Sequence, residues 1–248
     1  MIPIKTRDEI GRMRASGRIA AEVLAAVAGR IAPGVPTAEL DEFAAAMIRE
    51  RGARSAFKGY RGYPGHICVS VNREVVHGIP GPRRIEPGDI VSLDVGVVFD
   101  GFVGDTARTV MVGVTDERVA RLVLATEQAL WAGIARAVDG GRLSDISHAI
   151  ESTASAAGFS VVRDFVGHGV GRAMHEEPQI PNFGAPGRGP RLREGMTLAI
   201  EPMVNLGGSA VRTLDDGWTA VTQDGLPSAH FEHTVAIGAE GPDVLTRA

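Results

Sequence analysis

Two aspartates in this sequence, Asp94 and Asp105, are spaced to lie side by side on neighbouring β-strands. They flank the dipeptide Asp100-Gly101 within a run rich in valine, leucine and phenylalanine. Asp-Gly between apolar runs is a strong hairpin signal, because a type I′ turn needs positive φ at both central residues. The two carboxylates then share one sheet face, about 7–8 Å apart at Cα. The alternative is a solvated surface pair, but both strands look buried, so a cation between the carboxylates is the better interpretation.

The second half of the chain repeats the pattern of the first. A shift of 107 positions carries residues 34–37 onto 141–144, and residues 84–94 onto 191–201, so that each repeated strand ends on a carboxylate, Asp94 or Glu201. Glu232 lies in a further β-rich run and would pair with Glu201 much as Asp105 pairs with Asp94. Identity between the segments is low, which leaves chance as the alternative. We interpret the repeat as two α+β halves related by an approximate two-fold.

These four carboxylates and His168, which is flanked by glycines, form a candidate metal site. Oxygen ligands with one imidazole suit Mn, Fe, Co or Zn. Two divalent ions would balance four carboxylates, and such ion pairs occur in hydrolytic centres. Without metal, each close pair of carboxylates would repel by about 4 kcal/mol at about 4 Å and an effective dielectric constant of about 20. The alternative for any single acid is a solvated surface position.

The helices and strands that must position these residues can be predicted from the spacing of apolar residues and from capping and turn residues. Apolar spacing predicts helices over residues 6–30, 37–52, 116–137 and 144–157, with Thr37 and Ser144 as N-caps. A short strand is predicted over 67–71. The Asp-Gly turn predicts that Phe99 pairs with Phe102, and Gly96 with Asp105.

Composition excludes several classes of protein. The chain has 248 residues, a net charge of −4 and one cysteine, Cys68. It therefore has no basic footprint for nucleic acid and no disulfide framework. No secretory leader or membrane span is evident, which predicts a soluble cytoplasmic protein. Because the candidate centre needs both halves, about 1–115 and 116–248, we expect one domain over 1–248.

At these residues the chain resembles a known family. The motifs are HGIP (77–80), LDVG (93–96), GDTART (104–109), GHGVGRAMHEEP (167–178), IEPM (200–203) and FEHT (231–234). As an ordered set they resemble methionine aminopeptidase of the type I bacterial form, in metallopeptidase family M24. The resemblance implies an α+β pita-bread (creatinase/aminopeptidase) fold: a curved antiparallel sheet with two helix pairs related by a pseudo-two-fold.

The resemblance also implies residue roles. The metal ligands would be Asp94, Asp105, His168, Glu201 and Glu232. The catalytic residues would be Glu201, His77 and His175, with both histidines also facing the substrate. The methionine pocket would comprise Tyr60, Tyr63, Cys68, Met174 and Trp218. Two positions depart from the bacterial pattern, Phe57 in place of cysteine and Met174 in place of phenylalanine, so we expect an altered pocket shape. A monovalent cation would bind near Asn72 and Ser228.

The implied reaction is metal-dependent removal of the initiator methionine from nascent proteins and peptides when the second residue is small. A water bridging two ions would attack the scissile carbonyl, with Glu201 as general base. The expected partners are nascent chains and, transiently, the ribosome, with no nucleic-acid sequence recognition, no membrane and a monomeric state. Two alternatives are an X-Pro peptidase, which shares the fold and ligand pattern, and a metal-free binding module. HGIP and the five retained ligands favour the methionine enzyme.

Overall fold

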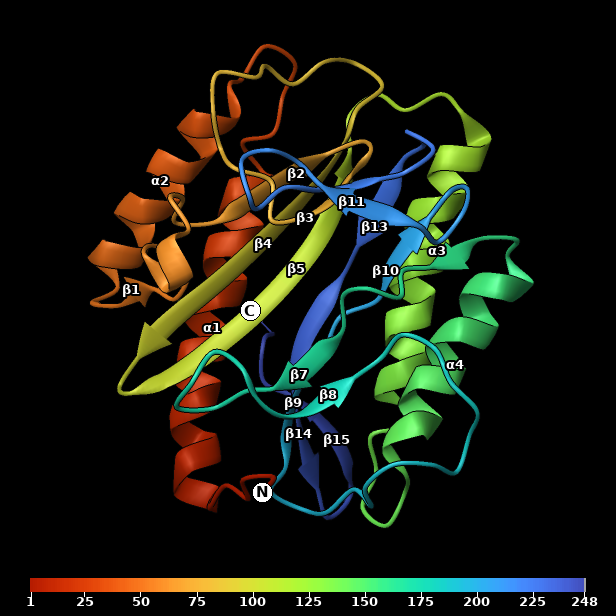
Figure 1. Cartoon of the computed structure of the whole chain (residues 1–248). Coiled ribbons are helices and arrows are strands. Elements are labelled where there is room, and N and C mark those ends of the chain that lie inside the picture. Colours follow the sequence, from red (N-terminus) through yellow and green to blue (C-terminus); the bar gives the residue numbers. More distant parts are fainter. Residues whose placement is uncertain (248) are drawn as a thin grey trace.

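A computed structural model describes residues 1–247 (Figure 1). The helices are α1 (Arg7–Ala28), α2 (Thr37–Glu50), α3 (Glu117–Ile134) and α4 (Leu143–Ala156), with a short 3₁₀ turn η1 (Tyr60–Gly62). The strands are β1 (Arg54–Ser55), β2 (Cys68–Val71), β3 (Glu74–Val76), β4 (Ile90–Phe99), β5 (Phe102–Met111), β6 (Ser160–Val161), β7 (Gly167–Gly169), β8 (Glu176–Ile180), β9 (Thr197–Ile200), β10 (Met203–Asn205), β11 (Val211–Thr213), β12 (Ala220–Thr222), β13 (Ser228–His230), β14 (Glu232–Gly238) and β15 (Gly241–Val244). Among the described residues, no helix is long and apolar enough to cross a membrane.

The molecule is built on one large antiparallel sheet with a helix pair on either side of its centre, α1 with α2 and α3 with α4 (Figure 1). The strand order is β1-β4-β5-β14-β9-β7-β8, with β2 also paired to β4 and β15 to β14. The β5–β14 pairing joins strands that lie more than 120 residues apart in sequence. The α+β pita-bread fold expected from the resemblance is confirmed.

The β4–β5 hairpin has the register that its turn predicts. Phe99 pairs with Phe102 and Gly96 with Asp105. The central turn residues, Asp100 and Gly101, both have positive φ, 49° and 76°, as a type I′ turn requires. This register fixes which side chains of the two long strands share a face.

Each helix pair packs on the sheet through its own apolar core. One core contains Ile19 and Val23 of α1 with Leu40 and Ile48 of α2. The other contains residues of α3 and α4, namely Leu122, Leu130, Ile146 and Ile150. Burial of these side chains is the main favourable term that holds the helices against the sheet.

Helix α1 approaches β5 so closely that both contact residues are glycines. A Cβ built on Gly104 would lie 2.5 Å from the backbone nitrogen of Gly17. Real Cβ atoms do not approach backbone atoms to that distance, so the contact requires glycine at this position of β5.

The loop before each pair's second helix is hydrogen-bonded in the same way, in both halves, to the segment that leads into β4 or β9. Gly34 N–H donates to the Ile85 carbonyl at 2.7 Å, and Gly140 N–H donates to the Leu192 carbonyl at 3.0 Å. The two acceptors, Ile85 and Leu192, are 107 residues apart, as in the sequence repeat. The two donors, Gly34 and Gly140, are 106 residues apart. The backbone pairing therefore recurs with a one-residue difference in the loop.

Both predicted N-caps are wrong. Pro36 and Arg142 are the capping residues, so Thr37 and Ser144 lie inside the first helical turns. Their hydroxyls instead donate to carbonyls of distant loops, Thr37 to Gly81 at 3.1 Å and Ser144 to Arg188 at 3.0 Å. A cap is inferred from local sequence, whereas these hydroxyls serve tertiary contacts that local sequence does not reveal.

Candidate metal centre

The five side chains predicted to bind metal converge from both halves of the sheet. Asp94 lies on β4, Asp105 on β5, His168 on β7 and Glu232 on β14. Glu201 follows β9 by one residue, just before Pro202, whose missing N–H cannot continue the strand pairing. Pairing of β5 with β14, and of β14 and β7 with β9, is what brings the two halves of the ligand set together.

The distances within the set are short. His168 Nε2 lies 3.4 Å from Glu201 Oε1 and 3.8 Å from Asp105 Oδ2. Ligand atoms of Asp105, His168 and Glu232 all lie within 4.8 Å of one another. A single divalent ion could therefore reach all three side chains with small rotamer adjustments.

The buried carboxylates lack the partners that would stabilise their negative charge. One oxygen each of Asp94, Asp105 and Glu232 is buried with no hydrogen-bond partner. Burial and the neighbouring carboxylates raise the pKa of Asp105 and of Glu232 well above the usual range. Burial likewise raises the pKa of Asp94 to about 7 and that of Glu201 to about 8. Buried carboxylates without partners are costly, so this donor set fits divalent metal.

His168 is held in the tautomer that a metal ligand needs. Its Nδ1 lies 2.9 Å from the carbonyl oxygen of Gly169. Because a carbonyl can only accept, Nδ1 carries the proton and Nε2 presents a lone pair toward the carboxylates. Burial lowers the pKa of His168 to about 3, which keeps the imidazole neutral.

A cavity of about 290 Å³ opens above the ligand set. Its lining contains every residue predicted for the substrate pocket as well as the five predicted ligands. Cys68 pairs directly opposite Asp94 across β2 and β4, which places it on the ligand-bearing face. Phe57 also lines the cavity, and its ring packs on Gly96, where a Cβ would lie 2.5 Å from Phe57 Cε1. The Phe57 ring therefore fills part of the cavity wall where the resemblance leads us to expect a smaller cysteine.

The two predicted catalytic histidines lie in the cavity wall in different environments. Tyr60 Oη lies 2.8 Å from Nδ1 of His175, and the two rings stack at 5.4 Å. When Tyr60 donates this bond, the proton of neutral His175 is on Nε2. His77 has positive φ, 61°, and its ring contacts those of Phe165 and Trp218 edge-on. Burial lowers the pKa of His77 to about 4, so it is neutral at pH 7.

Three residues of the site were not predicted. Phe165 and Arg61 line the cavity. His230 is fully buried, with Nε2 3.6 Å from Glu201 Oε2, and burial lowers its pKa. Period-two alternation could have indicated His230, because it precedes Glu232 by two residues and so shares its side of the chain. Phe165 reaches the cavity from a loop and Arg61 from the short turn η1, and neither offers such a signal.

The residues expected near a monovalent cation are neighbours. Ser228 N–H donates to the carbonyl of Asn72 at 2.9 Å, and Asn72 Nδ2 donates to Asp89 at 2.7 Å. Asn72 also has positive φ, 57°. The neighbouring Asn205 keeps one buried side-chain oxygen without a partner. This cluster lies outside the cavity lining.

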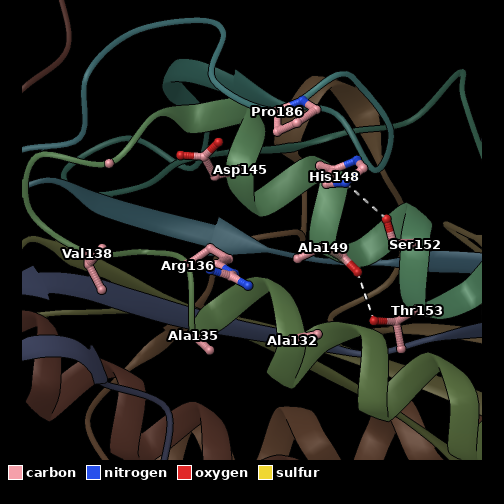
Figure 2. A pocket seen from close by; sticks show the side chains of 11 residues that line it. Ala132, Ala135, Arg136, Val138, Asp145, His148, Ala149, Ser152, Thr153 and Pro186 are labelled. Carbon is pink, nitrogen blue, oxygen red and sulfur yellow. Dashed lines mark hydrogen bonds between the residues drawn. The ribbon is translucent and has the colours of Figure 1, made fainter.

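A larger hollow, about 780 Å³, lies on the outer face between α3 and α4, away from the ligand set (Figure 2). Its one lining carboxylate, Asp145, accepts backbone N–H groups of Arg142 and Gly187. Its one lining histidine, His148, lies within 3.4 Å of Ser152 (Figure 2). Both groups are used in local structure, so the chemistry belongs to the smaller cavity.

Comparison with known proteins was made by sequence and by structure. The profile of metallopeptidase family M24 matches residues 11–239. Methionine aminopeptidase 1 of Bacillus subtilis is 52% identical over 247 residues, covering 100% of each chain. The crystal structure of methionine aminopeptidase from Thermotoga maritima superposes with a TM-score of 0.98 at 49% identity, covering 100% of each chain. Prolidase from Pyrococcus furiosus shares the fold, with a TM-score of 0.81 at 24% identity over 99% of this chain and 65% of that one.

Proposed function

The chain belongs to metallopeptidase family M24, and from this premise we propose that it removes the N-terminal methionine from proteins and peptides whose second residue is small. The observation that carries the proposal is the convergence of four carboxylates and His168 beneath an apolar cavity walled by two neutral histidines. Full-length relatives at about half identity bear the same named activity. A donor set of this kind suits a hydrolytic metal centre.

The closed end of the cavity accounts for a preference for methionine. Tyr63 and Cys68 are buried, and the Trp218 ring meets that of Tyr63 edge-on at 5.1 Å. Met174 is also buried at this wall. Soft, polarisable and aromatic groups favour a thioether side chain. A cavity of about 290 Å³ leaves little room beyond the methionine, so a bulky second residue is excluded.

Asp94, Asp105, His168, Glu201 and Glu232 would hold the metal. Bound divalent ions would polarise the scissile carbonyl and lower the pKa of water. Glu201 acts as the base: its carboxylate accepts a proton from the attacking water and returns it to the leaving amine. Burial raises the pKa of Glu201 to about 8 in the metal-free protein. Bound cations would favour the carboxylate form, which is the form that accepts a proton.

The histidines bind the reacting amide. His175, held by Tyr60 through Nδ1, donates from Nε2 to the oxyanion that develops on the substrate. His77 is fixed by Phe165 and Trp218 and orients the scissile amide. Both rings are positioned by packing, so neither must reorganise during the reaction.

The composition of the centre follows from its charge and its donors. Four carboxylates balance two divalent cations, and oxygen and imidazole donors accept Co, Mn, Fe or Zn. A monovalent cation near Asn72 and Ser228 would complete the set. The two halves, about 1–115 and 116–248, form one catalytic domain because each contributes ligands to the same centre.

The setting of the reaction extends the proposal. The substrates are nascent polypeptides in the cytoplasm, and the protein acts as a monomer that contacts the ribosome transiently through the surface of its own domain. It recognises neither a nucleic-acid sequence nor a membrane.

A direct assay tests the activity. Metal-loaded protein should release free methionine from a Met-Ala-Ser peptide and leave Met-Trp-Ser and Xaa-Pro peptides almost intact. Release from Xaa-Pro peptides in place of Met-Ala-Ser would identify an X-Pro peptidase. No turnover of either peptide at full metal loading would refute an aminopeptidase function.

A further inference from the structure

One cationic side chain, Arg61, lies at the rim of the cavity in a costly backbone conformation. Its φ and ψ are 48° and 24°, in the left-handed region. The flanking glycines, Gly59 and Gly62, also have positive φ, 81° and 91°. Residues with a Cβ are disfavoured in this region, and glycine or asparagine would adopt it more readily. Strain of this kind at a cavity rim points to a use for the side chain.

Arg61 has no structural partner that would explain the arginine. Within residues 1–247 its guanidinium makes no hydrogen bond or ion pair, and its one aromatic contact is with the Tyr60 ring, 5.4 Å from the centroid. Arg12 and Arg172 behave differently, since they pair with Asp100 and Glu9. Arg61 is therefore an exposed cation that the fold holds at the cavity without neutralising it.

The rim is where the rest of a peptide must pass. Most of the cavity lining is buried or half-buried, and its exposed members are Arg61 and His175. A methionine in the closed end places the scissile bond at the ligand set, so the third and later residues leave through this opening. Of the side chains that line the cavity, other than the predicted metal ligands, Arg61 is the one with a permanent charge.

We propose that Arg61 is a specificity-determining residue that favours peptides with an acidic side chain at the third position and disfavours a basic one. The inference rests on the proposed function. The interaction lies away from the scissile bond, so it acts on substrate binding: the preference appears in KM, and kcat is nearly equal for the two peptides.

The test compares Met-Ala-Asp-Ser, Met-Ala-Lys-Ser and Met-Ala-Ser-Ser amides on metal-loaded protein. Wild-type kcat/KM should favour the acidic over the basic peptide by about fivefold, the size expected when an exposed ion pair replaces a like-charge contact. The ratio should approach one in 1 M salt, where the screening length is about 3 Å. Arg61→Asn, which suits the left-handed backbone, should abolish the preference, and Arg61→Lys should keep most of it.

Lys58 provides a matched control. It is exposed and three residues away, and its ammonium donates to the carbonyl of Pro64, but it does not line the cavity. Lys58→Gln should leave the acid-to-base ratio unchanged. The proposal is overturned if wild-type protein has the same kcat/KM for the acidic and the basic peptide. It is also overturned if the acid-to-base ratio falls equally in Lys58→Gln and Arg61→Asn.

Failure of the proposed function gives a different result. If wild-type protein does not cleave Met-Ala-Ser-Ser, the aminopeptidase assignment fails. Calorimetric binding of the acidic and basic peptides to metal-loaded protein then decides the role of Arg61, with tighter acidic binding supporting it and equal binding refuting it.

Discussion

Replacing Glu201 with glutamine should stabilise the metal-free protein, although the same change removes the proposed catalytic base. The Glu201 side chain is only 13% exposed and lies beside other carboxylates, and burial raises its pKa from 4.5 to about 8. The folded state therefore keeps a proton that the unfolded chain releases above about pH 4.5. Stability falls as pH rises from about 4.5 to about 8 and is constant above that range.

The magnitude follows from the pKa difference. Each unit between the unfolded pKa and the working pH is worth about 1.4 kcal/mol, so the buried carboxyl costs about 3 kcal/mol at pH 7 and less than about 1 kcal/mol at pH 5. Glutamine has nearly the same shape and no such cost. Its amide can also donate to the partnerless oxygens of the cluster.

The assay is urea unfolding of EDTA-treated wild type and Glu201→Gln at pH 5, 7 and 8.5. The variant should exceed wild type by about 3 kcal/mol at pH 7, with a gain that grows with pH. With divalent metal the order should reverse, because a ligand is lost. Glu194→Gln, at an exposed position, is the control and should show no pH-dependent gain. A metal-free variant less stable than wild type at every pH would refute the reasoning.

Other perturbations test the site and the fold. Chelation should lower the wild-type Tm and added Mn²⁺ should restore it, since ligand binding stabilises the native state; a Tm indifferent to EDTA would argue against a metal centre. His77→Ala and His175→Ala should each lower kcat/KM by 10²-fold or more, an estimate of about 3 kcal/mol per lost donor, while elemental analysis shows normal metal content; loss of metal would make them ligands. Gly104→Ala should destabilise the fold by about 3 kcal/mol because its Cβ meets the backbone of Gly17. Gly11→Ala should not destabilise the fold, because a Cβ built on Gly11 meets nothing within 4 Å.

The hairpin could be predicted because its determinants are local. Asp100-Gly101 fixes the turn, the turn fixes the register, and the register puts Asp94 and Asp105 on one face. The convergence of His168 with these aspartates is different. It depends on β7 pairing with β9 and β14 with β5, which no local pattern specifies. The family resemblance, carried by the ordered set of motifs, predicted that His168 joins these aspartates, whereas the spacing of apolar residues could not.

Where local reasoning failed, a tertiary contact was the cause. Thr37 and Ser144 look like caps, but the loops at Gly81 and Arg188 take their hydroxyls. The interaction of His230 with Glu201 needs the pairing of β13 with β10. The rim position of Arg61 depends on a left-handed backbone at three of the four positions 59–62, namely Gly59, Arg61 and Gly62. Composition alone does not assign that conformation to an arginine.

The proposed function requires that four carboxylates from both halves of the sheet and His168 form one divalent metal centre. An anomalous difference map from crystals soaked in Mn²⁺ tests it most directly. Strong peaks are expected about 2.0–2.2 Å from oxygens of the carboxylates and from His168 Nε2. Peaks only elsewhere on the molecule, with the cluster empty at full Mn²⁺ loading, would contradict it.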